Sequence, residues 1–209
     1  NTVIRRDDGT LYGDNTDYFG FDYMSKSCGA DYNGKKVLVL GSGGASLTVC
    51  AVAKDCGAKE IVVISRSGEN NYGNIDKHHD ADIIVNTTPG GMYPNNGESP
   101  VDLSRFSDLC GVVDIVYNPW RTALLLQAES LGIKCKGGLS MLVAQAAYAS
   151  EQFTGRRISY GEIEKVAAVM TCGLIPNGLN LWMEDGELLR FAIWHRKKIA
   201  AFLREKAGI

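Results

Sequence analysis

Residues 37–46 read Val37-Leu38-Val39-Leu40-Gly41-Ser42-Gly43-Gly44-Ala45-Ser46, and this stretch decides the fold. The apolar run predicts a buried strand, the glycines predict a tight turn, and residues 47–55 have the spacing of a helix. A glycine turn that opens a helix aims backbone N–H groups and the positive end of the helix dipole at one point, which suits a pyrophosphate. Gly41 and Gly43 would make the turn and the close approach. Ser46 stands where this fingerprint usually has Gly or Ala.

A second predicted strand, residues 60–65, follows at the distance that a dinucleotide-binding unit requires. An NAD-binding unit has Asp or Glu at the end of this strand for the ribose hydroxyls, whereas a 2′-phosphate requires a cation. This chain has Ser65-Arg66-Ser67 there, with no carboxylate before Glu69. The sequence therefore favours NADP over NAD, and the alternative is a solvated arginine in a turn.

Composition excludes several other classes of protein. The 209 residues, 45% of them apolar, can bury the core of one ordinary domain plus an appendage. A net charge of −2 gives no electrostatic argument for nucleic acid or an anionic membrane, and no membrane-length apolar run or signal peptide is visible. Six cysteines without C-x-x-C spacing are typical of a reducing compartment, so we expect a cytoplasmic protein with no zinc site.

The remaining elements alternate along the chain. Residues 1–6 and 11–13 predict a hairpin around Asp8-Gly9, and a helix over residues 17–28 would end at Gly29. Residues 66–82 are polar and too short for a full helix and strand. Strands are expected at 81–86, 112–116 and 133–136, and helices at 121–131 and 140–153, the latter with a plausible continuation to 169. This order predicts an α/β, Rossmann-like, mostly parallel sheet with helices on both faces.

Six motifs, in order, carry a family resemblance. They are Asn1-Thr2-Val3, Gly13-x-Asn15-Thr16-Asp17, Gly41-x-Gly43-Gly44-Ala45-Ser46, Asn86-x-Thr88-Pro89-x-Gly91-Met92, Asp114-x-Val116-Tyr117-Asn118-Pro119 and Gly137-Gly138-x-x-Met141-Leu142-Val143-x-Gln145-Ala146-Ala147. Together they resemble shikimate dehydrogenase, the NADP-dependent enzyme of the shikimate pathway, from its interdomain region to its C-terminal end.

The resemblance implies a substrate side. Asn1 and Asp17 would contact shikimate hydroxyls, and Asp17 would pair with a lysine that assists proton transfer while hydride passes to or from the nicotinamide. Gln145 would hydrogen-bond the substrate from the cofactor side, with Tyr117 near it. The alternatives are an acid stabilising a helix N-terminus for Asp17, a solvated helix residue for Gln145, and an aromatic anchor of the turn for Tyr117.

The resemblance also implies a cofactor side. Gly43, Gly44, Ala45 and Arg66 would hold the pyrophosphate and the 2′-phosphate, while Thr88 and Met92 would line the nicotinamide and its ribose. The full predicted cofactor set is Gly41, Gly43, Gly44, Ala45, Ser65, Arg66, Ser67, Thr87, Thr88, Met92, Gly138 and Met141. Met141 is also a candidate core residue. No metal ligand is predicted.

These roles divide the chain into three predicted regions. Residues 1–34 would be an interdomain hairpin and helix, residues 35–170 the NADP-binding domain, and residues 171–209 a linker and C-terminal helical extension. Within the last region, residues 187–206 have the spacing of one amphipathic helix, which would pack on the domain or form a homodimer.

The chain departs from the family pattern in one large respect. The paired serines that bind the substrate carboxylate and the catalytic lysine belong to an N-terminal domain that these residues do not match, and Lys26, Lys35 and Lys36 stand in no matching motif. We therefore expect a part of a longer enzyme, or a relative that has lost that domain, which binds NADP better than it oxidises shikimate. The alternatives are a quinate/shikimate dehydrogenase relative, a non-catalytic NADP-binding module and an interaction protein that works through its tail helix.

Overall fold

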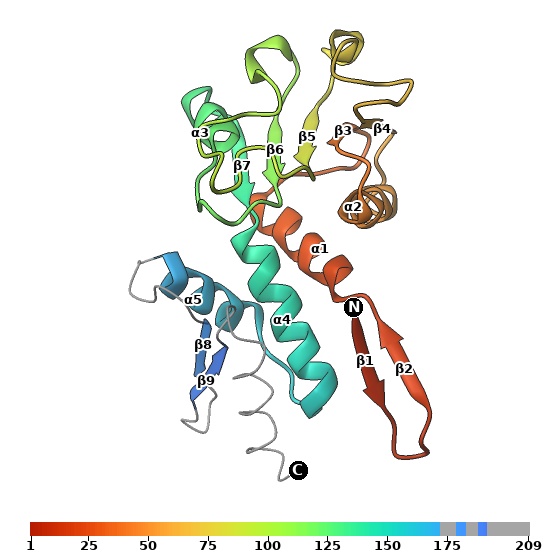
Figure 1. Ribbon diagram of the computed structural model, residues 1–209, viewed down its shortest axis with the longest axis vertical. Helices are drawn as coiled ribbons and strands as arrows, with labels where there is room; N and C mark the ends of the chain where they lie inside the picture. The colour runs from red at the N-terminus through yellow and green to blue at the C-terminus, as the bar shows by residue number, and fades with distance from the viewer. Residues whose placement is uncertain (172–178, 183–187, 192–209) are drawn as a thin grey trace. The chain divides into compact units, whose positions relative to one another are not determined.

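The computed structural model describes residues 1–171, 179–182 and 188–191 (Figure 1). The chain falls into two compact units, Asn1–Ile158 and Ser159–Ile209. The predicted functional boundaries at residues 34 and 170 stay predictions.

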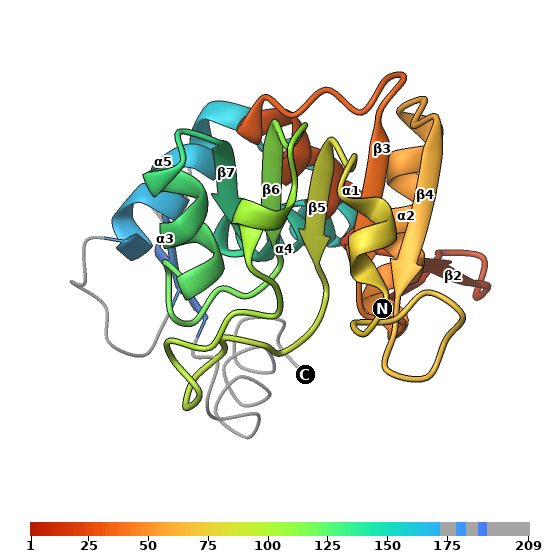
Figure 2. The same ribbon diagram turned by 90° about the horizontal axis from the view of Figure 1, so that it is seen from above.

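The first unit is built on a five-stranded parallel sheet with strand order β4-β3-β5-β6-β7 (Figure 2). Its strands are β3 (Lys36–Leu40), β4 (Glu60–Ile64), β5 (Ile83–Asn86), β6 (Gly111–Asp114) and β7 (Lys134–Gly137). Leu40, the last residue of β3, pairs with Ile64 of β4 on one side and with Asn86 of β5 on the other. The three strands therefore end side by side, so Gly41, Ser65 and Thr87 leave the sheet at the same edge.

Both faces of the sheet are covered by helices, as the sequence predicts. Helices α1 (Thr16–Cys28), α2 (Gly44–Asp55) and α4 (Leu139–Thr154) lie on one face, and α3 (Ala123–Ser130) with the short turns η1 (Ile75–His78) and η2 (Leu103–Arg105) lies on the other (Figure 2). Val37 and Val39 join the core cluster under the first of these layers, while Leu38 and Leu40 join the cluster under the second. All four are fully buried, because a parallel strand between two helical layers has no solvent face. The α/β, Rossmann-like fold is confirmed.

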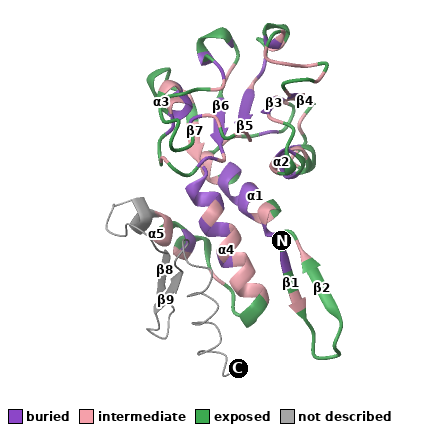
Figure 3. Cartoon of the chain, viewed as in Figure 1, coloured by how far each residue is buried: buried purple, intermediate pink, exposed green. Residues whose placement is uncertain are grey.

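The hairpin and the first helix are also confirmed. Strands β1 (Thr2–Arg5) and β2 (Leu11–Asp14) pair antiparallel, and most of their side chains are exposed (Figure 3). Asn15 caps α1 by accepting a bond from the Asp17 N–H, and Gly29 ends the helix in the left-handed region at φ 69°.

Several predicted boundaries were wrong. Helix α2 begins at Gly44 rather than at residue 47, so the last glycine of the turn already belongs to its first turn. The strand predicted from residue 81 begins at Ile83, and the strand predicted over 112–116 is Gly111–Asp114. Between β4 and β5, a stretch that the structure describes in full, the sole helical element is the single turn η1, so the shortened repeat is confirmed.

The predicted continuation of the 140–153 helix to residue 169 was wrong because α4 stops at Gly155, where φ is 70°. A separate helix, α5 (Tyr160–Thr171), follows in the second unit. Ser159 and Glu162 form a reciprocal cap: the Ser159 Oγ accepts from the Glu162 N–H at 3.3 Å, and a Glu162 carboxylate oxygen accepts from the Ser159 N–H at 2.6 Å. The spacing Ser-x-x-Glu was the signal for this start.

The tail prediction was wrong where it can be tested. Leu188–Phe191 is strand β9, which pairs antiparallel with β8 (Leu179–Trp182), so a helix cannot begin at residue 187. A short apolar run cannot be assigned to helix or strand by periodicity alone, and pairing with β8 decides it. The rest of the predicted helix, residues 192–206, lies outside the described residues. No helix in the described part of the chain is long and apolar enough to span a membrane.

Candidate cofactor-binding site

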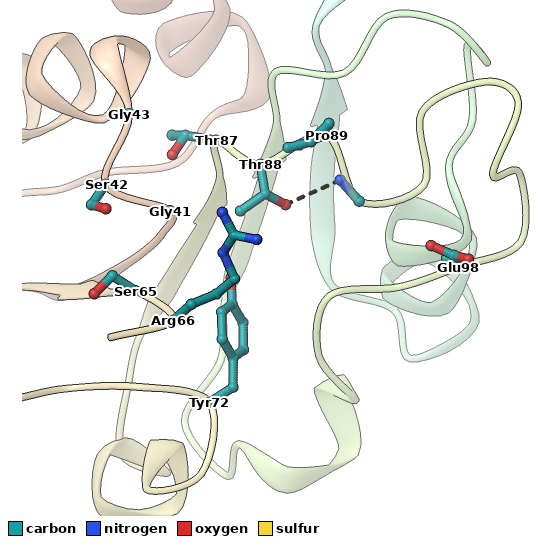
Figure 4. Close-up of a pocket in the computed structure, with 11 residues that line it drawn as sticks. Gly41, Ser42, Gly43, Ser65, Arg66, Tyr72, Thr87, Thr88, Pro89 and Glu98 are labelled. Carbon is teal, nitrogen blue, oxygen red and sulfur yellow. Dashed lines mark hydrogen bonds between the residues drawn. The ribbon is translucent and has the colours of Figure 1, made fainter. Parts of the chain in front are cut away.

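A cavity of about 700 Å³ opens at the edge of the sheet where β3, β4 and β5 end (Figure 4). Its lining comes from the turn after β3, the start of the loop after β4 and the loop after β5. The lining residues are Gly41, Ser42, Gly43, Ser65, Arg66, Tyr72, Thr87, Thr88, Pro89, Gly90 and Glu98. After β4 the chain crosses to the other side of β3 to form β5, and this reversal is the place where doubly wound sheets bind ligands.

The turn after β3 requires glycine at position 41. Its φ is 104°, a conformation that L side chains rarely adopt, and its N–H donates to the Ile64 carbonyl at 2.8 Å. A Cβ at this position would lie 2.8 Å from the Thr87 Oγ1 and 2.9 Å from the Thr88 Cγ2. The glycine therefore lets the turns after β3 and β5 approach each other at the cavity.

The N-terminus of α2 has no side-chain cap and has free space around its first residues. No side chain caps the helix at Gly43, and its first turn holds no acidic residue. A Cβ at Gly43 or Gly44 would meet nothing within 4 Å, so the protein's own packing does not require glycine at either position. Ser46 is buried and its hydroxyl donates to the Gly43 carbonyl at 2.6 Å, which is how the helix accommodates a hydroxyl at that place.

Arg66 places a positive charge on the cavity wall just after β4 (Figure 4). Within the described part of the chain, no carboxylate forms an ion pair with its guanidinium. Ser65 lines the cavity beside it. An unpaired guanidinium next to a hydroxyl, at the end of the second strand of the unit, fits a phosphate on the ribose better than it fits a bare ribose hydroxyl.

A buried polar network holds the wall formed by the turn after β5. Asn86 is fully buried, and its Oδ1 accepts from the Thr88 N–H at 2.9 Å and the Thr88 hydroxyl at 2.7 Å. Its Nδ2 donates to Asp114 at 3.0 Å, and the second carboxylate oxygen of Asp114 accepts from the Thr122 hydroxyl at 2.6 Å. Burial raises the pKa of Asp114, while these bonds and one from the Val116 N–H oppose the rise. The network fixes Thr88 against the cavity.

The predicted substrate residues lie outside this cavity, and two of them meet directly. The Asn1 Nδ2 donates to Asp17 at 2.9 Å, and the Asn1 Oδ1 accepts from the Thr16 N–H at 2.9 Å. Within the described part of the chain, no hydrogen bond reaches the second oxygen of Asp17. Gln145 belongs to α4 where that helix crosses α1, since a Cβ at Gly20, one turn after Asp17, would lie 3.1 Å from the Gln145 Cβ. Tyr117 is exposed on the loop after β6.

The structure brings part of the predicted cofactor set together. Gly41, Gly43, Ser65, Arg66, Thr87 and Thr88 all line the cavity. Six others do not line it: Gly44, Ala45, Ser67, Met92, Gly138 and Met141. Met141 is buried in the core cluster beneath α1, and a Cβ at Gly138 would fall 2.0 Å from the Ile115 carbonyl oxygen, so both have a packing role. Whether any of the set contacts a cofactor stays a prediction.

Five lining residues were missed from the sequence: Ser42, Tyr72, Pro89, Gly90 and Glu98. Three of them, Ser42, Pro89 and Gly90, lie within the motifs quoted in the sequence analysis, so the neighbouring motif residues could have indicated their place in the site. Tyr72 and Glu98 lie in irregular loops, and nothing local to the sequence marks them.

The three lysines left without a role are engaged in ion pairs. Lys26 pairs with Asp22 at 2.7 Å, Lys35 with Asp82 at 2.8 Å, and Lys36 with Asp80 at 2.8 Å. Among the described residues, no group of three or more His, Cys, Asp or Glu side chains could hold a metal ion.

Comparison with known proteins gives consistent matches. Residues 138–168 match the family model of the Shikimate 5'-dehydrogenase C-terminal domain. The NADP(+) shikimate dehydrogenase of Clostridium perfringens (strain SM101 / Type A) is 35% identical over 185 residues, which cover 82% of this chain and 68% of that protein.

Solved structures agree. The chorismate mutase/shikimate 5-dehydrogenase fusion protein of Clostridium acetobutylicum superposes with a TM-score of 0.77 at 34% identity, over 83% of this chain and 67% of that one. The shikimate 5-dehydrogenase of Thermus thermophilus, solved in complex with NADP(H) and shikimate, gives a TM-score of 0.68 at 30% identity, over 80% and 66%. The chain thus spans about two thirds of the length of these relatives. It belongs to the shikimate dehydrogenase family of oxidoreductases and carries the C-terminal, dinucleotide-binding part.

Proposed function

We propose that this chain is the cofactor-binding part of an NADP-dependent enzyme that reduces 3-dehydroshikimate to shikimate, and that it has little or no turnover alone. The observation that carries the proposal is the cavity at the switch point of the sheet, which Arg66 lines without a carboxylate partner among the described residues. The pairing of Asn1 with Asp17 supports the substrate side.

In this proposal, the cofactor-side and substrate-side residues have separate binding roles. The N–H groups at the start of α2 and the dipole of that helix would bind the pyrophosphate, and Arg66 with Ser65 would bind the 2′-phosphate. The bound nicotinamide supplies the hydride chemistry. Asn1 holds one oxygen of the Asp17 carboxylate, which leaves the other to accept a hydrogen bond from a substrate hydroxyl and orient it. Gln145 offers both a donor and an acceptor, which suits vicinal hydroxyls.

The first test is a binding titration with NADP and NAD on the wild-type chain and on Arg66→Ala. Loss of a charge-assisted contact with phosphate costs about 1.5–3 kcal/mol, so the Kd for NADP should rise roughly 10- to 100-fold while the Kd for NAD stays unchanged. Arg5→Ala is the matched control because Arg5 is an exposed arginine of the hairpin, away from the cavity lining. If NADP and NAD bind equally in the wild type, the assignment of Arg66 is wrong.

The same preparation should be assayed for shikimate-dependent reduction of NADP, with quinate as a second substrate. Tight NADP binding without turnover is the expected result. Efficient turnover would contradict the proposed dependence on a lysine from outside the matched motifs. Failure to bind either dinucleotide would remove the proposal altogether.

A further inference from the structure

We propose that Tyr72 is a second determinant of NADP selectivity: its hydroxyl, beside the unpaired Arg66 guanidinium on the cavity wall, donates a hydrogen bond to the 2′-phosphate. The inference rests on the proposed function and deepens it. Both residues line the same cavity, and the Tyr72 ring rises from its loop toward the Arg66 side chain (Figure 4).

The phosphate needs more than Arg66. A ribose 2′-phosphate carries up to two negative charges near neutral pH, and between residues 65 and 74 Arg66 is the one cationic side chain. Two hydroxyl-bearing residues of the same stretch, Ser65 and Tyr72, line the cavity with Arg66, whereas Ser67 does not. A phenolic hydroxyl on the same wall would supply a further donor without a further charge.

The ring of Tyr72 is held by packing. Its ring is half-buried and packs against the core cluster that contains Ile64 and Ile75. Among the described residues, no partner accepts a hydrogen bond from its hydroxyl. Burial raises the pKa of this hydroxyl, and the charge of Arg66 opposes the rise. A fixed ring with an uncommitted donor at the cavity is a preorganised contact, which loses little entropy on binding.

Asparagine side chains fix the loop that carries it. Asn71 donates from its Nδ2 to the Gly68 carbonyl at 3.1 Å and accepts from the Gly73 N–H at 2.9 Å. The Asn74 Oδ1 accepts from the Asn71 N–H at 2.8 Å, and its Nδ2 donates to the Glu69 carbonyl at 2.8 Å. The loop then returns to the strand end, where the Ser65 N–H donates to the Asn70 carbonyl at 3.1 Å. Tyr72 therefore lies on a closed loop beside Arg66.

The test is Tyr72→Phe, which removes the hydroxyl and keeps the ring. We expect the Kd for NADP to rise about tenfold, as for loss of one hydrogen bond to a charged group, with the Kd for NAD unchanged. Adenosine 2′,5′-bisphosphate and adenosine 5′-monophosphate should show the same difference, since they isolate the 2′-phosphate. Tyr12→Phe is the matched control, a tyrosine of the hairpin outside the cavity lining.

The outcomes separate this inference from the proposed function. If Arg66→Ala weakens NADP selectively and Tyr72→Phe does not, the role of Tyr72 is overturned while the proposed function stands. Equal weakening of NADP and NAD by Tyr72→Phe would assign the ring to packing and also overturn it. If the wild type binds neither dinucleotide, both fail. The double variant Arg66→Ala/Tyr72→Phe should prefer NADP over NAD less than Arg66→Ala does, and a double variant with the same preference as Arg66→Ala would contradict the role of Tyr72.

Discussion

The Thr122 hydroxyl is a single group on which the wall of the cavity depends. It donates to the buried Asp114 carboxylate at 2.6 Å and accepts from the Leu125 N–H at 3.4 Å at the start of α3. Thr122→Val leaves one oxygen of a buried charge without a donor, so we expect a loss of about 1–3 kcal/mol in the free energy of unfolding at pH 7. Urea denaturation measures the free energy of unfolding. The control is Thr122→Ser, which keeps the hydroxyl and should be about as stable as the wild type.

The loss should depend on pH in a defined direction. Burial raises the pKa of Asp114 above its unfolded value, so this residue favours the folded state most at acidic pH, and that contribution is lost as pH rises through the folded pKa. Removing the Thr122 donor raises the folded pKa further. The destabilisation by Thr122→Val should therefore be largest at neutral pH and shrink toward the unfolded pKa near 4. Thr154→Val, which removes a hydroxyl that donates to the Ser150 backbone carbonyl and to no carboxylate, should show no such trend. A pH-independent loss would assign the effect to the helix cap alone.

At the scale of elements, Gly41 and Gly43 have different roles in the turn between β3 and α2. Gly41→Ala forces a Cβ into the left-handed region and against Thr87 and Thr88, and should cost about 1–3 kcal/mol of stability as well as NADP affinity. Gly43→Ala meets nothing within 4 Å, so it should leave stability within about 0.5 kcal/mol and weaken NADP alone. Thermal unfolding and NADP titration on the same samples separate the two effects.

Gly13→Ala is the control for this pair, because Gly13 belongs to the hairpin and a Cβ there meets no atom within 4 Å. It should change neither quantity. A Gly43→Ala variant with wild-type NADP affinity would mean that no ligand backbone or phosphate comes close to that position, and the start of α2 would lose its proposed role.

Elements coded by local pattern could be predicted from the sequence. The strand at residues 36–40, the glycine turn and the end of α1 at Gly29 follow from apolar runs and φ requirements, and the same reasoning located Arg66. Long-range pairing could not be predicted in the same way. Leu188–Phe191 is a strand because it pairs with Leu179–Trp182. Tyr72 reaches the cavity because its loop folds back on the end of β4, where the Ser65 N–H donates to the Asn70 carbonyl. Neither pairing can be deduced from the residue types at these positions.

At the scale of the whole molecule, every described residue that lines the cavity belongs to the unit Asn1–Ile158. Asn1, Asp17 and Gln145 belong to it as well. If the tail were the working surface of an interaction protein, dinucleotide binding would be incidental to it. A chain that ends at Ile158 discriminates between these functions, because it keeps the complete lining and removes the second unit.

We expect the shortened chain to bind NADP with a Kd within about twofold of the full chain, since no lining residue is removed and a twofold change is well under 1 kcal/mol. Isothermal titration gives the Kd, and the preference for NADP over NAD is measured beside it, because an incorrectly folded chain would lose both. The control is the full chain carrying Arg66→Ala, which keeps the second unit and should show a reduced preference. A shortened chain that folds, as judged by circular dichroism and cooperative unfolding, but binds NADP more than tenfold more weakly would place part of the cofactor site beyond Ile158. The cavity at the ends of β3, β4 and β5 would then be only part of the site.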